Sequence, residues 1–233
     1  VGRSVEDIEI VLNTIAGKDS LDSTTVDIES RIMNQESGMG KIKIGVPKEY
    51  FDTEGTDPEV ISATDNSIKK LEAMGCKIVP VSLPHTKYAI AAYYIIVPSE
   101  DSSNLARLDG VRYGVRTKTK NLYDLYAESR ANGFPEEVKR RILIGTYALS
   151  AGYYDAYYKK AQAVRPLIKK DFDDVFKKVD ALITPTTPSP AFKIGEKIND
   201  TLAMYLADVF VSPAAVAGVP ALSVPAGVNK KKL

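Results

Sequence analysis

One acidic residue stands alone in the C-terminal part of the chain. Asp208 is the single charged residue between Thr201 and Asn229, and its neighbours are apolar. This pattern predicts a helix over 201–211 that is hydrophobic on all sides, as is typical of a buried helix. An ionised carboxylate in such surroundings costs several kcal/mol unless a cation or hydrogen bonds compensate it. Asp208 is therefore a candidate for binding a charged ligand, and a structural ion pair or a helix-cap contact is an equally open interpretation.

A cation that could match Asp208 lies on the helix predicted to follow Pro135. An apolar stripe runs along that helix through Val138, Ile142, Gly145 and Leu149. At about 100° per residue, Arg141 falls at the edge of this stripe and faces inward, whereas Arg140 faces outward. An inward arginine can hold a carboxylate with two parallel hydrogen bonds, which a lysine cannot do. The alternative is that Arg141 extends along the edge into solvent.

The remaining residues offer no other catalytic arrangement. The sequence contains no Ser/His/Asp or Cys/His set, no metal-ligand spacing and no G-x-S-x-G motif. His85 follows a proline and is expected to be a surface or turn residue, and Cys76 is expected to be a small buried hydrophobe. Residues 36–41 resemble a phosphate-binding loop superficially but lack the G-x-x-x-x-G-K-[ST] spacing. The chain therefore has no recognisable nucleophile.

Alternating strands and helices are expected to position these residues. The residues from Ser4 to Gly17 predict a capped amphipathic helix, followed by a long surface connection over 18–40. A strand at 42–47, a helix at 58–74 and a strand at 77–81 form a βαβ unit, which implies parallel pairing. The predicted class is α/β, with a mostly parallel mixed sheet covered by helices on both faces.

The rest of the chain is predicted to be mainly helical. A helix over 88–108 is expected to break or bend near Pro98. A helical region over 136–178 is expected to divide near Gly152 and to bend at Pro166. The other predicted elements are a helix at 122–131, a strand at 179–184, a short helix at 213–217 and a last strand at 221–225.

Composition sets further limits on function. The chain has 233 residues and a net charge of +1, which gives no overall field to attract a polyanion or an anionic membrane surface. No apolar run reaches the ~18 residues of a membrane span, and no leader peptide is recognised. The single cysteine favours a reducing compartment. Because the last predicted strand is followed only by a polar loop, the chain is expected to be a piece of a longer protein.

Several strings of residues resemble the amidase signature family, and within it the glutamine-hydrolysing A subunits of glutamyl-tRNA(Gln) amidotransferases. The strings lie at Val1–Asp7, Lys43–Tyr50, Ser102–Gly110, Glu137–Ile142, Gly152–Tyr158 and Ala217–Pro225. The resemblance implies an amidase signature fold, of which residues 1–233 form the C-terminal part of a single domain. It also implies that the N-terminal catalytic part and the C-terminal end are missing.

The resemblance implies an activity that this chain carries only in part. Family members of this kind hydrolyse glutamine with a Ser-Ser-Lys triad that lies upstream of the matching segment. The ammonia passes to a partner subunit, which uses ATP and Mg²⁺ to convert Glu-tRNA(Gln) to Gln-tRNA(Gln). The resemblance implies subunits B and C as partners, contact with Glu-tRNA(Gln) mainly through those partners, a cytoplasmic location and no membrane. No catalytic residue and no cofactor or metal site is expected in this chain, which by itself is expected to be inactive.

The resemblance also assigns roles to three residues. Arg141 aligns with the arginine that binds the carboxylate of glutamine, Asp208 with the aspartate that binds its amino group, and Tyr93 with a tyrosine that lines the pocket. Adjacent tyrosines on a helix face different directions, so the choice of Tyr93 over Tyr94 depends on the register of the alignment. Two alternatives remain: a hydrolase of another small amide, and a non-catalytic binding or interaction fragment.

Overall fold

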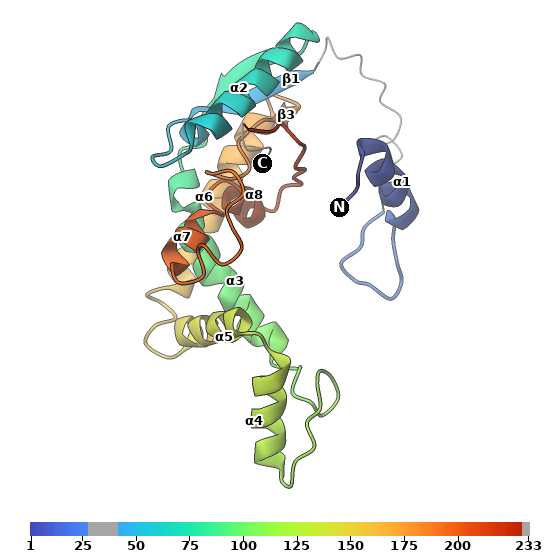
Figure 1. Ribbon diagram of the computed structural model, residues 1–233, viewed down its shortest axis with the longest axis vertical. Helices are drawn as coiled ribbons and strands as arrows, with labels where there is room; N and C mark the ends of the chain where they lie inside the picture. The colour runs from blue at the N-terminus through green and yellow to red at the C-terminus, as the bar shows by residue number, and fades with distance from the viewer. Residues whose placement is uncertain (28–41, 230–233) are drawn as a thin grey trace. The chain divides into compact units, whose positions relative to one another are not determined.

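The computed structural model describes residues 1–27 and 42–229 and divides into two compact units, Val1–Gly38 and Met39–Leu233 (Figure 1). In the first unit, helix α1 spans Val5–Ile15, and Ser4 Oγ accepts a hydrogen bond from the Asp7 amide at 3.1 Å. The capped helix is thus confirmed, although none of its residues is buried. Most of the predicted connection over 18–40, and all of the segment 36–41, lies outside the described residues.

A parallel sheet forms the centre of the second unit. Strands β1 (Lys43–Pro47), β2 (Lys77–Val81) and β3 (Ala181–Leu182) are arranged in the order β2-β1-β3, and both pairings are parallel. Helix α2 (Pro58–Ala73) connects β1 to β2, and the Asp57 side chain caps its first turn. The predicted βαβ unit is therefore confirmed, and the third strand is shorter than the predicted range 179–184.

Helices cover both faces of this sheet. Ile78 and Pro80 of β2 line one surface hollow together with Ile68 of α2. Val79 and Val81, which alternate with them along β2, pack on the opposite face. There they contact a buried cluster that includes residues of helix α6 (Tyr158–Phe176). Successive side chains of a strand point to opposite faces, which explains this alternation. The structure confirms the α/β class, with a parallel sheet flanked by helices.

Further helices and helical turns complete the second unit. They are η2 (Lys48–Tyr50), η3 (Thr86–Tyr88), α3 (Ala89–Leu105), α4 (Leu122–Gly133), α5 (Glu136–Leu149), α7 (Thr201–Leu206) and α8 (Ser212–Ala217), the two η elements being 3-10 turns. The predicted division near Gly152 is confirmed, because α5 and α6 are separate helices. No helix within 1–27 or 42–229 has both the length and the apolar character needed to cross a membrane.

Of the break or bend predicted near Pro98, a break is not present, because α3 continues through this proline. Pro98 is fully buried where α3 crosses α5, and a Cβ placed on Gly145 would lie 1.8 Å from the Pro98 carbonyl oxygen. The next residue, Ser99, donates its hydroxyl to the Ile95 carbonyl at 2.7 Å. A proline removes one helical hydrogen bond, and here close packing against α5 keeps the helix intact across it.

Two C-terminal predictions are wrong. The helix expected over 201–211 ends at Leu206 and has no buried residue, so it is not a buried helix. The segment 221–225 is not a strand, and its side chains Leu222 and Val224 are 65% and 58% exposed. A strand requires a neighbour that satisfies its backbone N–H and C=O groups, and no described residue pairs with this segment. Predictions from local apolar composition alone therefore gave too much regular structure in both segments.

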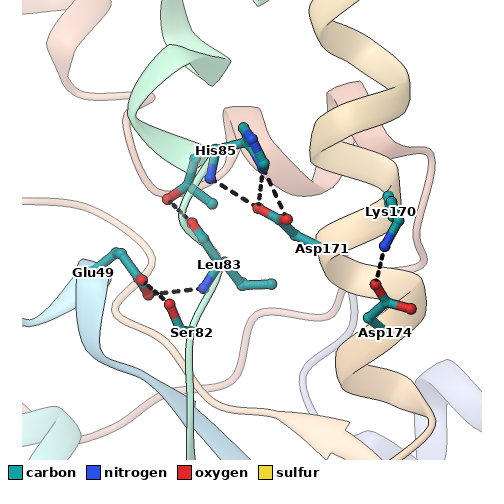
Figure 2. A network of polar contacts seen from close by, with 8 residues as sticks. Glu49, Ser82, Leu83, His85, Lys170, Asp171 and Asp174 are labelled. Carbon is teal, nitrogen blue, oxygen red and sulfur yellow. Dashed lines mark hydrogen bonds and ion pairs between the residues drawn. The ribbon is translucent and has the colours of Figure 1, made fainter.

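A network of polar contacts joins the ends of β1 and β2 to α6 (Figure 2). The Glu49 carboxylate accepts hydrogen bonds from the Ser82 hydroxyl and from the Leu83 amide, the latter at 2.9 Å. His85 lies in a turn, as predicted, and its Nδ1 is 2.9 Å from Oδ1 of Asp171 on α6. Cys76 is a free, buried thiol, as predicted. These contacts fix the chain where it leaves β2 and enters α3.

Glu49 gives this part of the fold a dependence on pH. Burial would raise the pKa of the Glu49 carboxyl, but hydrogen bonds from Ser82 and Leu83 outweigh burial and hold the pKa below its ordinary value. Such a carboxylate stabilises the folded state above its unfolded-state pKa, and the contribution is lost as the pH falls through its folded-state pKa. We expect Glu49→Gln to lower the free energy of unfolding by about 1 kcal/mol at pH 7.

The measurement is a denaturant titration of the wild type and the variant at pH 7 and near pH 3. The difference between them should shrink at the lower pH. Glu54→Gln is the matched control, because Glu54 is exposed and its side chain forms no hydrogen bond within residues 42–229. A difference of the same size at both pH values would contradict the assigned role of the Glu49 charge.

Candidate functional site

The two charged residues singled out from the sequence contact the same tyrosine. The Tyr94 hydroxyl donates a hydrogen bond of 2.6 Å to Oδ2 of Asp208. The Arg141 guanidinium lies over the Tyr94 ring, with Cζ 5.7 Å from the ring centroid. These residues come from α5, from α3 and from the turn after α7. Tertiary packing thus brings together a cation and an anion that are 67 positions apart in the sequence, Arg141 and Asp208.

Close packing of α3 against α5 places Arg141 beside Tyr94. Gly145 lacks a side chain where α5 meets the Pro98 backbone. Arg141 and Tyr94 each lie one helical turn before these two residues, and the guanidinium lies over the Tyr94 ring. The Arg141 side chain is 27% exposed against 47% for Arg140, in agreement with the predicted inward and outward directions.

A well-anchored turn carries Asp208. The Asp208 carbonyl accepts hydrogen bonds from the Ser212 hydroxyl at 2.7 Å and from the Ser212 amide at 2.9 Å. Ser212 is 1% exposed. Phe210 is 4% exposed and stacks on Tyr50, with ring centroids 5.5 Å apart. The hydroxyl contact of Tyr94 and this anchoring give the Asp208 carboxylate a fixed position.

Tyr94, Arg141 and Asp208 form a cluster with two further residues, and these two were not predicted from the sequence. Glu137 Oε1 accepts a hydrogen bond of 3.0 Å from Arg141 Nε, and the same carboxylate pairs with Arg140. Tyr205 donates its hydroxyl to Glu137 Oε1 at 3.3 Å and stacks on Tyr94, with ring centroids 4.0 Å apart. The four-residue spacing of Glu137 and Arg141 is typical of a helical ion pair and could have indicated the first contact. No local pattern indicated Tyr205.

The protonation states of the cluster follow from its packing. Burial, and then the hydrogen bond to Asp208, raise the pKa of the Tyr94 hydroxyl, so it stays a neutral donor. Burial would raise the pKa of Glu137, but the hydrogen bond from Arg141 and the charge of Arg140 outweigh burial and lower it. Burial would lower the pKa of Arg141, but Glu137 outweighs burial and raises it. At neutral pH the cluster therefore keeps an anionic Glu137 beside a cationic Arg141.

Arg141 and Asp208 can each form further hydrogen bonds to a ligand. In residues 42–229, Arg141 forms its hydrogen bond through Nε, and its two terminal nitrogens have no hydrogen-bond partner. Asp208 has no cation within ion-pair distance in the same part of the chain. A guanidinium fork can hold a carboxylate, and a carboxylate can accept hydrogen bonds from an ammonium group. The arrangement is therefore suited to a zwitterionic ligand.

Tyr93 has a different environment from Tyr94. It is partly buried and packs against the main hydrophobic cluster of the second unit. Its ring meets that of Tyr94 edge to face, with centroids 5.1 Å apart. Tyr94, and not Tyr93, is the tyrosine that contacts both charged residues. The role of Tyr93 as a pocket residue stays a prediction.

Comparisons with known proteins cover the whole chain. A family model described as Amidase matches residues 1–233. The A subunit of the glutamyl-tRNA(Gln) amidotransferase of Thermodesulfovibrio yellowstonii is 55% identical over 235 residues, which are 100% of this chain and 48% of that protein. The corresponding subunit of Koribacter versatilis is 55% identical over 234 residues, covering 99% of this chain and 48% of that protein. The chain thus spans about half the length of these relatives.

Solved structures agree with the sequence relatives. The crystal structure of the glutamyl-tRNA(Gln) amidotransferase A subunit from Thermotoga maritima is similar with a TM-score of 0.62 at 35% identity, over 96% of this chain and 45% of that one. A bacterial aryl acylamidase of the amidase signature family has a TM-score of 0.69 at 20% identity, over 98% and 46%, which is a likeness of fold alone. From the family match over all 233 residues and these relatives, the chain belongs to the amidase family.

Proposed function

We propose that this chain is the glutamine-binding part of a glutamyl-tRNA(Gln) amidotransferase A subunit. Arg141 binds the α-carboxylate of glutamine, Asp208 binds its α-ammonium group, and Tyr93 lines the pocket. The observation that carries the proposal is the contact of Arg141 and Asp208 with one tyrosine, Tyr94. Two relatives that are 55% identical are named as A subunits of glutamyl-tRNA(Gln) amidotransferases, and these names support the proposal.

The proposed contribution to catalysis is orientation. Arg141 and Asp208 hold the amino-acid end of glutamine, so the side-chain amide extends toward the reacting groups in a defined direction. Fixing a substrate in this way lowers the barrier by removing translational and rotational freedom before the reaction. The Ser-Ser-Lys triad belongs to the N-terminal part of the domain, of which residues 1–233 are the C-terminal part. Water then converts the glutamine amide to glutamate and ammonia.

The proposal places the later steps in partner subunits. Subunits B and C assemble with the glutamine-hydrolysing one, and a partner uses the ammonia with ATP and Mg²⁺ to convert Glu-tRNA(Gln) to Gln-tRNA(Gln). Glu-tRNA(Gln) contacts mainly these partners, and the complex is cytoplasmic. In the described residues of this chain, no three His, Cys, Asp or Glu side chains converge on a position that could hold a metal ion.

Two glutamine analogues test the recognition of both charges. In the full-length protein with its partners, we expect kcat/KM for amide hydrolysis to fall about 10- to 100-fold with glutaramate, which lacks the α-amino group. A similar loss is expected with 4-aminobutanamide, which lacks the α-carboxylate. In each case the analogue leaves one charge of the site without its partner. Released ammonia is the measurement.

The same assay separates the alternatives. A hydrolase of another small amide would treat the two analogues as well as glutamine, or better. A non-catalytic binding or interaction fragment would give a full-length protein that releases no ammonia from any of the three compounds. Either result would contradict the proposed function.

A further inference from the structure

A single carboxylate links the two segments that carry the proposed binding charges. Glu137 lies one turn before Arg141 on α5, and its Oε1 accepts the Arg141 Nε–H at 3.0 Å. The same Oε1 accepts the Tyr205 hydroxyl at 3.3 Å. Tyr205 belongs to α7, the element that directly precedes the Asp208 turn. Glu137 therefore connects the helix of the cation with the segment of the anion.

These contacts close into a ring of four residues. Glu137 contacts Arg141 and Tyr205, and both of these contact the Tyr94 ring, at 5.7 Å for the guanidinium carbon and 4.0 Å for the stacked ring centroid. The Tyr94 and Tyr205 planes differ by 18°, which is a stacked geometry. Asp208 is attached to this ring through the Tyr94 hydroxyl. A shift of any member changes the separation of Arg141 and Asp208.

Glu137 contacts Arg141 at a nitrogen that leaves the guanidinium fork open to a ligand. Glu137 holds Nε, and within residues 42–229 the two terminal nitrogens of Arg141 remain available for a carboxylate. Glu137 is 42% exposed and also neutralises the charge of Arg140, which points away from the site. Its carboxylate thus fixes the guanidinium without occupying the fork that binds the ligand.

We propose that Glu137 is a positioning residue for glutamine, which sets the separation of Arg141 and Asp208 without touching the substrate. The separation selects a ligand that carries a carboxylate and an ammonium group on the same carbon atom. This inference rests on the proposed function, because it assumes that Arg141 and Asp208 hold those two groups.

The test is a double-mutant cycle in the full-length protein with its partners, with KM and kcat for glutamine measured separately. We expect Glu137→Ala to raise KM about 10-fold and to change kcat less than about 3-fold. Glu137→Gln keeps a carbonyl acceptor and should recover part of this loss. In an Arg141→Ala background, Glu137→Ala should change KM less than about 2-fold, because Glu137 acts through Arg141.

Glu136→Ala is the matched control. Glu136 is the preceding residue on α5, its side chain is 88% exposed, and it pairs with Lys139 outside the ring. This variant should leave KM unchanged. If Glu137→Ala does not fold, Tyr205→Phe takes its place, because it removes the hydroxyl that Glu137 accepts. Tyr205→Phe should also raise KM, and it is combined with Arg141→Ala in the same double-mutant cycle.

An unchanged KM in Glu137→Ala overturns the proposal, as does an effect of equal size with and without Arg141, which is the result of a general structural role. Failure of the proposed function is a distinct outcome. In that case Arg141→Ala alone leaves KM unchanged, and both the proposed function and the positioning role of Glu137 are overturned. If Arg141→Ala raises KM and Glu137→Ala does not, the positioning role alone is lost.

Discussion

Replacement of Arg141 by alanine is expected to raise KM for glutamine and to lower kcat/KM about 30- to 1000-fold, a loss of about 2 to 4 kcal/mol. The physical reason is that a substrate carboxylate would enter the site without its cation and would lose two charge-assisted hydrogen bonds. Asp208 would remain, so the ammonium end would still be held. Ammonia release by the full-length protein with its partners, over a range of glutamine concentrations, gives the measurement.

Arg141→Lys refines this expectation. Lysine keeps the positive charge but loses the planar fork and the Nε–H that Glu137 accepts. We therefore expect a KM between those of the wild type and Arg141→Ala. Lys139→Ala is the control, because Lys139 lies two residues away on α5 and pairs with exposed Glu136. A wild-type KM in Arg141→Ala would remove this arginine from the glutamine site.

Substitution of Gly145 by alanine is expected to destabilise the protein by about 3 kcal/mol. In an exposed helix the same change would stabilise by about 1 kcal/mol, because alanine has the higher helix propensity. Here the added Cβ would lie 1.8 Å from the Pro98 carbonyl oxygen and 2.8 Å from the Ser99 nitrogen. These are backbone atoms, so α3 and α5 must move apart. The denaturant midpoint of the full-length protein provides the measurement.

A second effect should accompany the loss of stability. Separation of α3 from α5 would also move Arg141 away from Tyr94, so KM for glutamine should rise in the fraction that folds. Gly133→Ala is the control, because the nearest atom to a Cβ there is Val115 Cβ at 3.4 Å, an ordinary contact. Equal or greater stability of Gly145→Ala would show that α5 has room for a methyl group beside the Pro98 backbone.

Many of the regular elements were predictable, and the wrong predictions have identifiable causes. The helix capped by Ser4 and the βαβ unit follow from residues that lie close together in the sequence. A break, one of the two outcomes expected near Pro98, does not occur, because α3 packs closely against Gly145 at this position. The strand expected over 221–225 was wrong because apolar composition cannot supply a pairing partner.

The sequence by itself identified the two charged residues of the candidate site, Arg141 and Asp208. Asp208 stands out as an isolated carboxylate, and periodicity turns Arg141 inward and Arg140 outward, which the exposed fractions bear out. These inferences depend on residue type and on spacing within a few helical turns. The resemblance of the quoted strings added the family, which the match over residues 1–233 shows.

Only the tertiary structure decided how these charges are connected. The Tyr94 hydroxyl reaches Asp208 across 114 positions of sequence, and the Tyr205 hydroxyl reaches Glu137 across 68. Helical periodicity relates residues three or four positions apart and contains no information on contacts of this range. Such contacts depend on how closely the helices pack, which the missing Cβ of Gly145 sets where α3 meets α5.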